Sequence, residues 1–343
     1  MKTKKLLLNL LLKQAKNHKK ASGFTLIELL VGLIIAFFVI TPLLGLAVSL
    51  LDTDRKEQAK STSEQEIQAA ADFIVRDLQQ AVFIYDANGL TQINSPNNAA
   101  KSGIKNQIPP EVGTDGCKKP TDCRPVLAFW KRRPIQDAVP RDSFNNKSSL
   151  NCTNANDEDE CDDSFVYSLV VYYLILGDST KKTWSETARI ARFEISDGVR
   201  YLGGQQIESG KSKREKDKGF EGFTLDKDVA AAMNTWVKES GVNQYTQSVQ
   251  VVADYIDREE IPAAQQRDLC PTDWTLTPDK PTYGFYACVN QEDNIARFYL
   301  GGNALARIRP RDQHDEIKCS DEGLAAYCPT VNAEVKAIGQ LVQ

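Results

Sequence analysis

Histidine is scarce in this chain: its 343 residues contain two, and one of them lies in a lysine-rich amino terminus. This scarcity leaves little material for histidine-based metal or acid–base chemistry. The Gly-x-Ser-x-Gly and His-Glu-x-x-His motifs and a glycine-rich phosphate loop after a strand are missing, and no pair of carboxylates can be assigned to glycoside hydrolysis. We therefore expect a protein that is not an enzyme and needs no cofactor.

Acidic residues are absent from residues 1–27, which carry seven lysines: Lys2, Lys4, Lys5, Lys13, Lys16, Lys19 and Lys20. Residues 29–51 then form 23 consecutive positions without a charge. As a helix rising 1.5 Å per residue, such a run is long enough to cross a hydrocarbon core of about 30 Å. Because positive flanks stay in the cytoplasm, we expect a single-pass protein of the inner membrane, with the chain after Leu51 outside.

An ordinary secretory signal is the alternative for this segment. Its apolar core would be about 7 to 15 residues long and would be followed by a small-residue cleavage site. Here the run is longer, no Ala-x-Ala site follows it, and the small residues Ala21, Ser22 and Gly23 precede it. Any cleavage is therefore expected before the apolar helix.

Glu28 is the one charged residue at the start of the apolar run. An unpaired carboxylate in lipid costs about 2.5 to 3.5 kcal/mol near the bilayer centre and less near an end, so such residues are functional by default. If the chain is cut after Gly23, Phe24 gains an amino group that can neutralise Glu28 of a neighbouring copy. We therefore expect Glu28 to act between subunits.

The segment 19–30, with its basic leader, Gly23, Phe24 and Glu28, resembles the class III signal of type IV pilins and pseudopilins. The resemblance implies that a prepilin peptidase cuts after Gly23 and methylates the amino group of Phe24, and that Glu28 acts in filament assembly. It also implies, as partners, other pilin or pseudopilin subunits through the amino-terminal helix, and a type IV pilus or secretion assembly machine. The final location would be a periplasmic or cell-surface filament.

The helix is expected to continue beyond the membrane. No Gly or Pro occurs in residues 52–87, and one face repeats apolar residues at three- and four-residue spacing: Ile67, Ala71, Ile74, Leu78, Ala81, Val82 and Tyr85. Asn88 and Gly89 provide the stop. We expect one helix over 24–85, roughly 93 Å long if straight, with Pro42 kinking it or locally melting it.

From Leu90 onward, short runs rich in Val, Ile, Tyr and Phe predict strands at 126–130, 165–176, 188–195, 248–256, 283–289 and 296–308. A second helix is expected over 226–239, with Val229, Met233 and Trp236 inward and Gly241 ending it. The predicted fold is α+β and type IV pilin-like, with the long helix packed on an antiparallel sheet. The predicted parts are a leader (1–23), a membrane helix (24–51), its amphipathic continuation (52–88) and a globular head (89–343).

All eight cysteines lie beyond the membrane helix, in a region predicted to be outside the cytoplasm, where disulfides form. Sequential pairing closes loops of five, eight, seventeen and eight residues with turn-forming residues in or beside them. We therefore expect local bonds rather than a zinc site, since no Cys-x-x-Cys pair exists and His314 is the only downstream histidine. The predicted pairs are Cys117 with Cys123, Cys152 with Cys161, Cys270 with Cys288, and Cys319 with Cys328.

An acidic run surrounds Cys161, with six carboxylates in seven positions: Asp157, Glu158, Asp159, Glu160, Asp162 and Asp163. A solvated loop is the favoured interpretation. A weaker one is a calcium site on Asp157, Asp159 and Asp162, although the glycine and terminal glutamate of an EF-hand are absent. Arg307, Arg309 and Arg311 would share one face of a strand, either as a solvated edge or as a contact for an acidic partner or an anionic glycan.

The net charge of the chain is −4, and because residues 1–51 hold seven lysines and one glutamate, residues 52–343 carry −10. Nucleic acid is therefore not an expected partner.

Residues 73–82, 125–131 and 167–173, with the 152–161 loop, resemble the cyanobacterial hormogonium polysaccharide secretion pseudopilins. That resemblance implies a part in polysaccharide export and gliding motility. Alternatives are a minor pilin for pilus assembly, adhesion or DNA uptake, a type II secretion pseudopilin, and an unprocessed single-pass envelope receptor.

Overall fold

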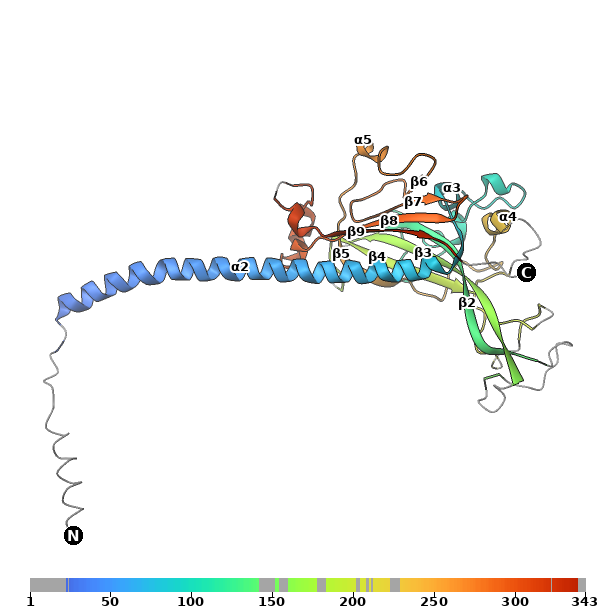
Figure 1. Ribbon diagram of the computed structural model, residues 1–343, viewed down its shortest axis with the longest axis horizontal. Coiled ribbons are helices and arrows are strands. Elements are labelled where there is room, and N and C mark those ends of the chain that lie inside the picture. Colours follow the sequence, from blue (N-terminus) through green and yellow to red (C-terminus); the bar gives the residue numbers. More distant parts are fainter. Residues whose placement is uncertain are drawn as a thin grey trace, which may run out of the picture. The chain divides into compact units, whose positions relative to one another are not determined.

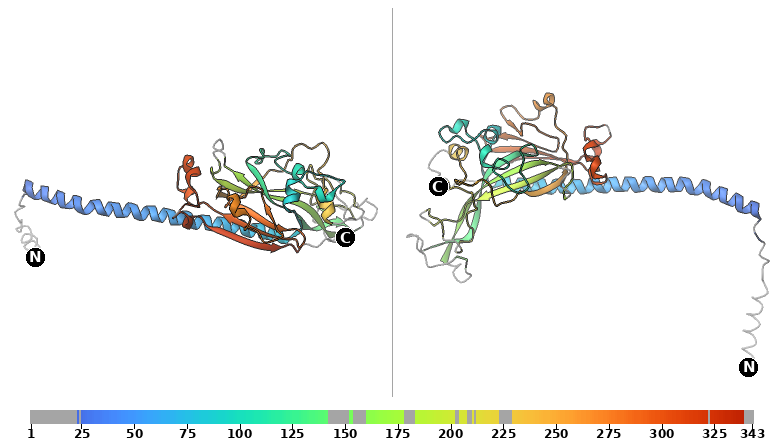
Figure 2. Two further views of the ribbon diagram at one scale, coloured as in Figure 1. Left: turned by 90° about the horizontal axis from the view of Figure 1, so that it is seen from above. Right: turned by 180° about the vertical axis from the view of Figure 1, so that it is seen from behind.

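The computed structural model describes residues 23, 25–141, 152–153, 160–177, 183–201, 204–207, 210, 212–222, 229–321 and 323–338. The chain divides into two compact units, one ending at Arg55 and one beginning at Lys56. Helix α2 (Leu26–Gln79) supplies the described helix of the first unit and enters the second (Figures 1 and 2). The second unit contains the strands and all eight cysteines.

One stripe of α2 is buried within the second unit. The buried residues recur every three or four positions, which is the spacing of one helix face: Ala59, Ser63, Ile67, Ala70, Ala71, Ile74, Asp77 and Leu78. Four of them, Ile67, Ala71, Ile74 and Leu78, were predicted to lie on this face. Asp77 is the one charged residue in this otherwise apolar or small stripe.

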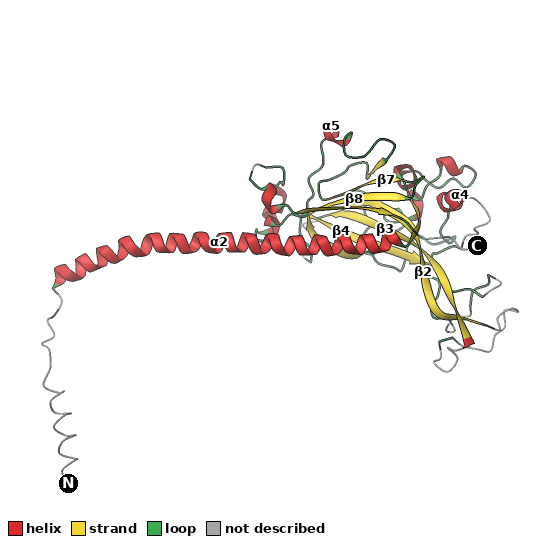
Figure 3. Ribbon diagram, viewed as in Figure 1, coloured by secondary structure: helices red, strands yellow, loops and turns green. Residues whose placement is uncertain are grey.

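Five antiparallel strands form the first sheet, in the order β1-β2-β3-β4-β5. They are β1 (Ala81–Ile84), β2 (Cys123–Pro140), β3 (Cys161–Leu176), β4 (Ala188–Ser196) and β5 (Gln250–Ile256). The long β2–β3 pair, drawn as two adjacent arrows in Figure 3, runs from Cys123↔Ile175 to Pro140↔Cys161. Val, Ile, Leu, Tyr and Phe dominate its centre, where both faces of the sheet are covered.

A second antiparallel sheet has the order β6-β7-β8-β9. Its strands are β6 (Thr275–Thr277), β7 (Phe285–Asn290), β8 (Ile295–Gly301) and β9 (Thr330–Lys336). The inner faces of both sheets pack with α2 into one apolar core that includes Ile74, Phe129 and Phe298. A second core on the other face of the first sheet centres on Trp130 and Phe193 and is covered by loops. The predicted α+β layout is thereby confirmed.

Both predicted helices are wrong in extent, and three strands were not predicted. Helix α2 ends at Gln79, and residues 81–84, expected to be helical, form β1, because this apolar segment pairs with β2 as a fully buried strand. The second helix, α4 (Val229–Asn234), stops well before Gly241, although Met233 and Trp236 are buried as expected; residues 226–228 lie outside the described residues. Strands β1, β6 and β9 were not predicted.

The arginines of 307–311 do not lie on a strand. Strand β8 ends at Gly301, and short 3-10 helices cover Leu305–Arg307 and Arg311–Glu316. Arg307 packs inward instead, donating to Ser63 Oγ at 2.8 Å and pairing with Glu66 on α2. The predicted shared face of Arg307, Arg309 and Arg311 is therefore wrong, because tertiary contacts with the helix take Arg307 out of the strand pattern.

Asp77 is the centre of a buried charge cluster between α2 and the first sheet. Its carboxylate lies 2.9 Å from Lys131 Nζ on β2 and 2.7 Å from Arg192 Nε on β4, and it accepts a hydrogen bond from the Tyr172 hydroxyl on β3 at 2.8 Å. Glu194 balances the second cation, with 2.6 Å to Arg192 and 3.4 Å to Lys131. We call these five residues the Asp77 cluster.

Electrostatics within the Asp77 cluster favour the ionised forms. Burial by itself would raise the pKa of Glu194, but the adjacent Arg192 and Lys131 outweigh it and lower the pKa to about 2. The charges are therefore paired rather than neutralised by proton transfer. Removing one member would leave a buried charge without compensation, which is the costly way to break such a group.

Asn294, in the β7–β8 turn, joins the two sheets. Its amide Nδ2 donates to Val82 O at 2.9 Å, and its Oδ1 accepts from Ile84 N at 2.9 Å. The side chain thus pairs with one backbone carbonyl and one backbone amide of β1, as the backbone of a neighbouring strand would. Its backbone has φ 58°, a left-handed conformation that asparagine tolerates better than most residues.

Four disulfide bonds stabilise the loops of the second unit, linking Cys117–Cys123, Cys152–Cys161, Cys270–Cys288 and Cys319–Cys328. These are the sequential pairs expected from the loop lengths, and they leave no cysteine free. Cys288 is fully buried on β7, where its bond to Cys270 fixes the segment before β6 against the outer face of the second sheet.

We expect Asp77→Ala to lower the free energy of unfolding by about 3 kcal/mol, because Lys131 and Arg192 would lose their shared buried partner. Chemical denaturation of the chain in detergent micelles, followed by near-ultraviolet circular dichroism, measures this. Asp72→Ala is the matched control: it is an exposed acid on the same helix, and its loss should cost no more than about 0.5 kcal/mol. Equal effects of the two substitutions would contradict the role given to Asp77.

Replacing both Cys270 and Cys288 by Ser should cost about 3 kcal/mol, since their bond closes a loop of seventeen residues. The corresponding double replacement at Cys117 and Cys123, which closes five residues, should cost less. Denaturation midpoints under non-reducing conditions test the order, and non-reducing peptide mapping tests the pairing. A peptide that joins two different loops would show that the pairing is wrong.

Candidate processing and assembly site

The start of α2 is a capping box built by Thr25 and Glu28. The Thr25 hydroxyl accepts from Glu28 N at 3.3 Å, and the Glu28 carboxylate accepts from Thr25 N at 3.0 Å and from the Thr25 hydroxyl at 3.1 Å. This reciprocal pattern satisfies backbone donors at the helix start that have no partner within the helix. It explains why helix α2 begins at Leu26.

In this geometry the Glu28 carboxylate is occupied within its own chain. Its contacts come from a residue three positions earlier, and the side chain remains exposed. A carboxylate in an apolar environment requires hydrogen-bond donors, and Thr25 supplies two of them. Pairing with an amino group of a neighbouring subunit would therefore replace or supplement an existing set of contacts, rather than capture a bare charge.

Gly23, the predicted cleavage position, is exposed, and a Cβ added to it would meet nothing within 4 Å. The described part of the fold therefore places no steric demand for glycine at position 23. Phe24, the predicted methylation site, and residues 1–22 lie outside the described residues.

The first part of α2 presents apolar side chains on all sides. An 18-residue window of this helix has a mean hydropathy of 2.7, and none of the window is buried. Leu33, Phe37 and Phe38 are each more than 60% exposed, whereas residues of this type are normally buried. By length and composition the segment is able to cross a membrane.

Pro42 lies inside α2, and the helix is continuous through it. Local melting at this position, which the sequence left open, is not seen, and Figure 1 shows the ribbon curving without a break. The residue before it, Thr41, donates its hydroxyl to Phe37 O at 2.8 Å. The carbonyl that Pro42 leaves without an amide donor is that of Phe38, four residues earlier.

Only one of the three proposed calcium ligands, Asp162, lies among the described residues. Asp157 and Asp159 lie outside the described residues. Asp162 forms an ion pair with Arg141 at 2.7 Å, and Asp163 accepts from Asp137 N at 2.9 Å. Among the described residues, no group of three or more His, Cys, Asp or Glu side chains could hold a metal ion.

Residues 18–44 match the family model described as the prokaryotic N-terminal methylation motif. The matched segment contains Gly23, Phe24, Glu28 and Pro42, and it coincides with the capping box and the apolar part of α2. The match supports a type IV pilin-like protein, which implies processing by a prepilin peptidase and assembly with other pilin subunits. Among the described residues, one helix is long and apolar enough to span a membrane, which fits a membrane-anchored type IV pilin. No curated protein and no solved structure matches it.

Thr25 is the site residue that sequence reasoning overlooked. The signal was present, because Thr or Ser followed three residues later by Glu, just before an apolar run, is the pattern of a capping box. Glu28 therefore has two roles: it is a charge at the start of the apolar run, and it is the N3 residue of the cap. The structure brings Thr25 and Glu28 together as one unit.

We expect Thr25→Val to weaken the helix start by about 1 kcal/mol, because the side-chain acceptor of the cap is lost. Amide hydrogen exchange of residues 26–30, measured on the unprocessed chain in micelles, should become roughly fivefold faster. Thr25→Ser keeps the hydroxyl and should exchange like the parent chain. Identical exchange in the Val and Ser variants would show that the cap contributes nothing.

Proposed function

We propose that this chain is a minor pilin or pseudopilin subunit, cleaved after Gly23 and methylated on Phe24 by a prepilin peptidase. It is then assembled through its amino-terminal helix into a type IV pilus-like filament. The observation that carries the proposal is the methylation motif at residues 18–44, with Glu28 in the first turn of an apolar helix. The orientation is amino terminus inside and head outside, and the role is structural rather than enzymatic.

We further propose that the filament supports polysaccharide secretion and gliding motility. This finer assignment is supported by the resemblance of residues 73–82, 125–131 and 167–173 to hormogonium polysaccharide secretion pseudopilins. The three segments meet in the structure: they contribute Asp77, Lys131 and Tyr172 to the Asp77 cluster. The resemblance therefore follows one packed unit, the junction of α2 with β2 and β3, rather than scattered positions.

Intact-mass spectrometry after co-expression with a prepilin peptidase tests the processing step. We expect loss of residues 1–23 and the mass of one added methyl group, both abolished in Gly23→Val; a Cβ at this position meets no described atom within 4 Å. A chain that keeps residues 1–23 would exclude a filament subunit and favour an unprocessed single-pass receptor.

Assembly is tested separately with Glu28→Ala. This variant should be processed and inserted into the membrane, yet be at least tenfold depleted in sheared filaments, because it cannot neutralise the amino group of its neighbour. Glu57→Ala, an exposed acid further along α2, is the control and should be recovered normally. Normal recovery of Glu28→Ala would count against the pairing.

Loss of secreted polysaccharide in a deletion strain, with protein secretion intact, separates the finer role from type II secretion.

A further inference from the structure

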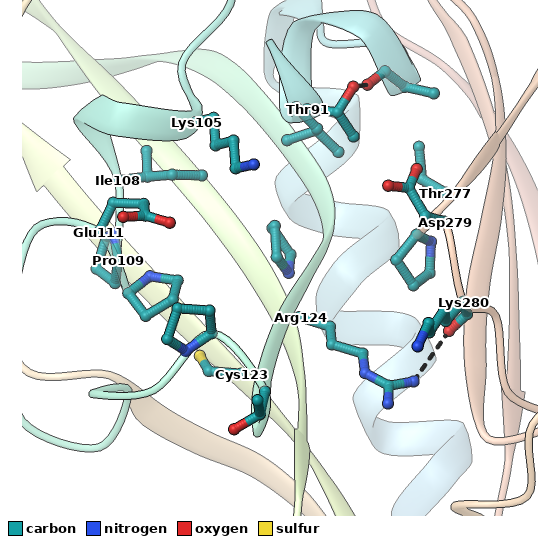
Figure 4. A pocket seen from close by; sticks show the side chains of 17 residues that line it. Thr91, Lys105, Ile108, Pro109, Glu111, Cys123, Arg124, Thr277, Asp279 and Lys280 are labelled. Atoms are coloured by element: carbon teal, nitrogen blue, oxygen red, sulfur yellow. Dashed lines mark hydrogen bonds between the residues drawn. The ribbon is translucent and has the colours of Figure 1, made fainter. Parts of the chain in front are cut away.

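A pocket of about 430 Å³ opens in the second unit. Four parts of the chain form it, three of them within residues 87–125: helix α3 (Ala87–Thr91), the residues around the short helix Lys105–Gln107, the start of β2 with the residues before it, and the end of β6 with the residues after it. Its volume is within the range of small-molecule sites, roughly 300 to 1,000 Å³. Figure 4 shows side chains from these parts converging on one space.

The walls of this pocket are apolar and conformationally restricted. Five of the lining residues are prolines, Pro109, Pro110, Pro120, Pro125 and Pro278, and Leu90 and Ile108 add aliphatic surface. One wall is fixed by the Cys117–Cys123 bond. Another is fixed by Arg124, which pairs with Glu260 at 2.8 Å and donates to Lys280 O at 3.2 Å. A ligand would thus meet a preformed C–H surface, which lowers the entropic cost of binding.

Two lysines at the pocket form no ion pair with a described residue. Lys105 and Lys280 are exposed and approach from different sides in Figure 4, and neither ammonium group has a partner among the described residues. They lie in a region, residues 52–343, whose net charge is −10. Unpaired cations at a concave site in an acidic domain favour a ligand that carries a carboxylate.

The remaining polar groups of the pocket are acceptors. The Thr91 hydroxyl already donates to Ala87 O at 2.7 Å, and the Thr121 hydroxyl donates to Asp122 at 2.8 Å, so each retains only its lone pairs for a ligand. The carboxylates of Glu111 and Asp279 also line the pocket, without a partner in the described part of the chain. A complementary ligand must therefore supply several hydrogen-bond donors as well as its carboxylate.

We propose that this pocket binds an acidic sugar unit, a hydroxylated ring with a carboxylate, as found in uronic-acid polysaccharides. Its carboxylate lies against Lys105 and Lys280, its hydroxyl groups donate to Thr91, Thr121, Glu111 and Asp279, and its C–H surface packs on the proline rings. An acidic peptide offers the carboxylate but fewer donors for its size. A neutral sugar offers donors but leaves both ammonium groups without a charge partner. The proposal rests on the proposed polysaccharide role and names the chemistry that the head recognises.

Isothermal titration of the full chain in detergent micelles with tetragalacturonate tests this pocket. Binding should weaken at least tenfold in the double variant Lys105→Ala with Lys280→Ala. It should persist in Lys101→Ala with Lys336→Ala, two exposed lysines outside the pocket. The methyl ester of the same oligomer, which keeps the hydroxyl groups and loses the charges, should bind at least tenfold more weakly, and tetraglutamate should not compete.

Several outcomes would overturn the proposal: no binding of tetragalacturonate, equal binding by both double variants, equal binding of the methyl ester, or preference for tetraglutamate. The pocket variants should be processed and incorporated into filaments normally, because none of their residues lies on α2. Failure of processing would contradict the filament role without changing the measured binding constants. Failure of the filament role and failure of the pocket proposal are therefore distinguishable.

Discussion

The ion pairs of Asp77 determine where helix α2 and the first sheet meet. One carboxylate on the helix contacts Lys131 on β2, Tyr172 on β3 and Arg192 on β4. Apolar packing alone tolerates small rotations and shifts of a helix on a sheet, whereas a charge held by three strands allows one rotation and one axial position. The apolar core of Ile74, Leu78 and Phe129 can therefore form in a single register, and the arrangement of the second sheet on the same core follows from it.

Sequence patterns predicted the parts of this molecule that depend on local chemistry. The apolar helix, its buried stripe, the centres of β2, β3, β4 and β5 and the cysteine pairs all follow from spacing along a short stretch of chain. Strand β1 was missed because Ala81, Val82 and Tyr85 continue the helical spacing of α2, and pairing with β2 overrides that periodicity. Asp77 resembled an ordinary exposed acid of an amphipathic helix, since its three strand partners lie far away in sequence.

The two candidate sites likewise differ in how far sequence patterns predict them. Gly23, Phe24 and Glu28 lie within six consecutive residues, so a motif is enough to identify them, and Thr25 lies inside the same motif. The pocket proposed to bind an acidic sugar combines α3, the residues around Lys105, the start of β2 and the residues after β6. No spacing in the sequence predicts that these parts lie together. Its lysines and threonines are individually ordinary surface residues, and they acquire a chemical meaning only when the fold places them around one cavity.

The four disulfides connect cysteines that are close in sequence, and none of them ties helix α2 to a sheet or one sheet to the other. In a subunit held by its amino-terminal helix and pulled through its head, the covalent bonds would keep the loops closed without carrying the load between these layers. That load would fall on the Asp77 cluster, on the amide of Asn294 and on the pairing of Arg307 with Glu66. These polar contacts would act together with the apolar core that α2 shares with both sheets, and because the charges of the Asp77 cluster are buried, salt would screen them little.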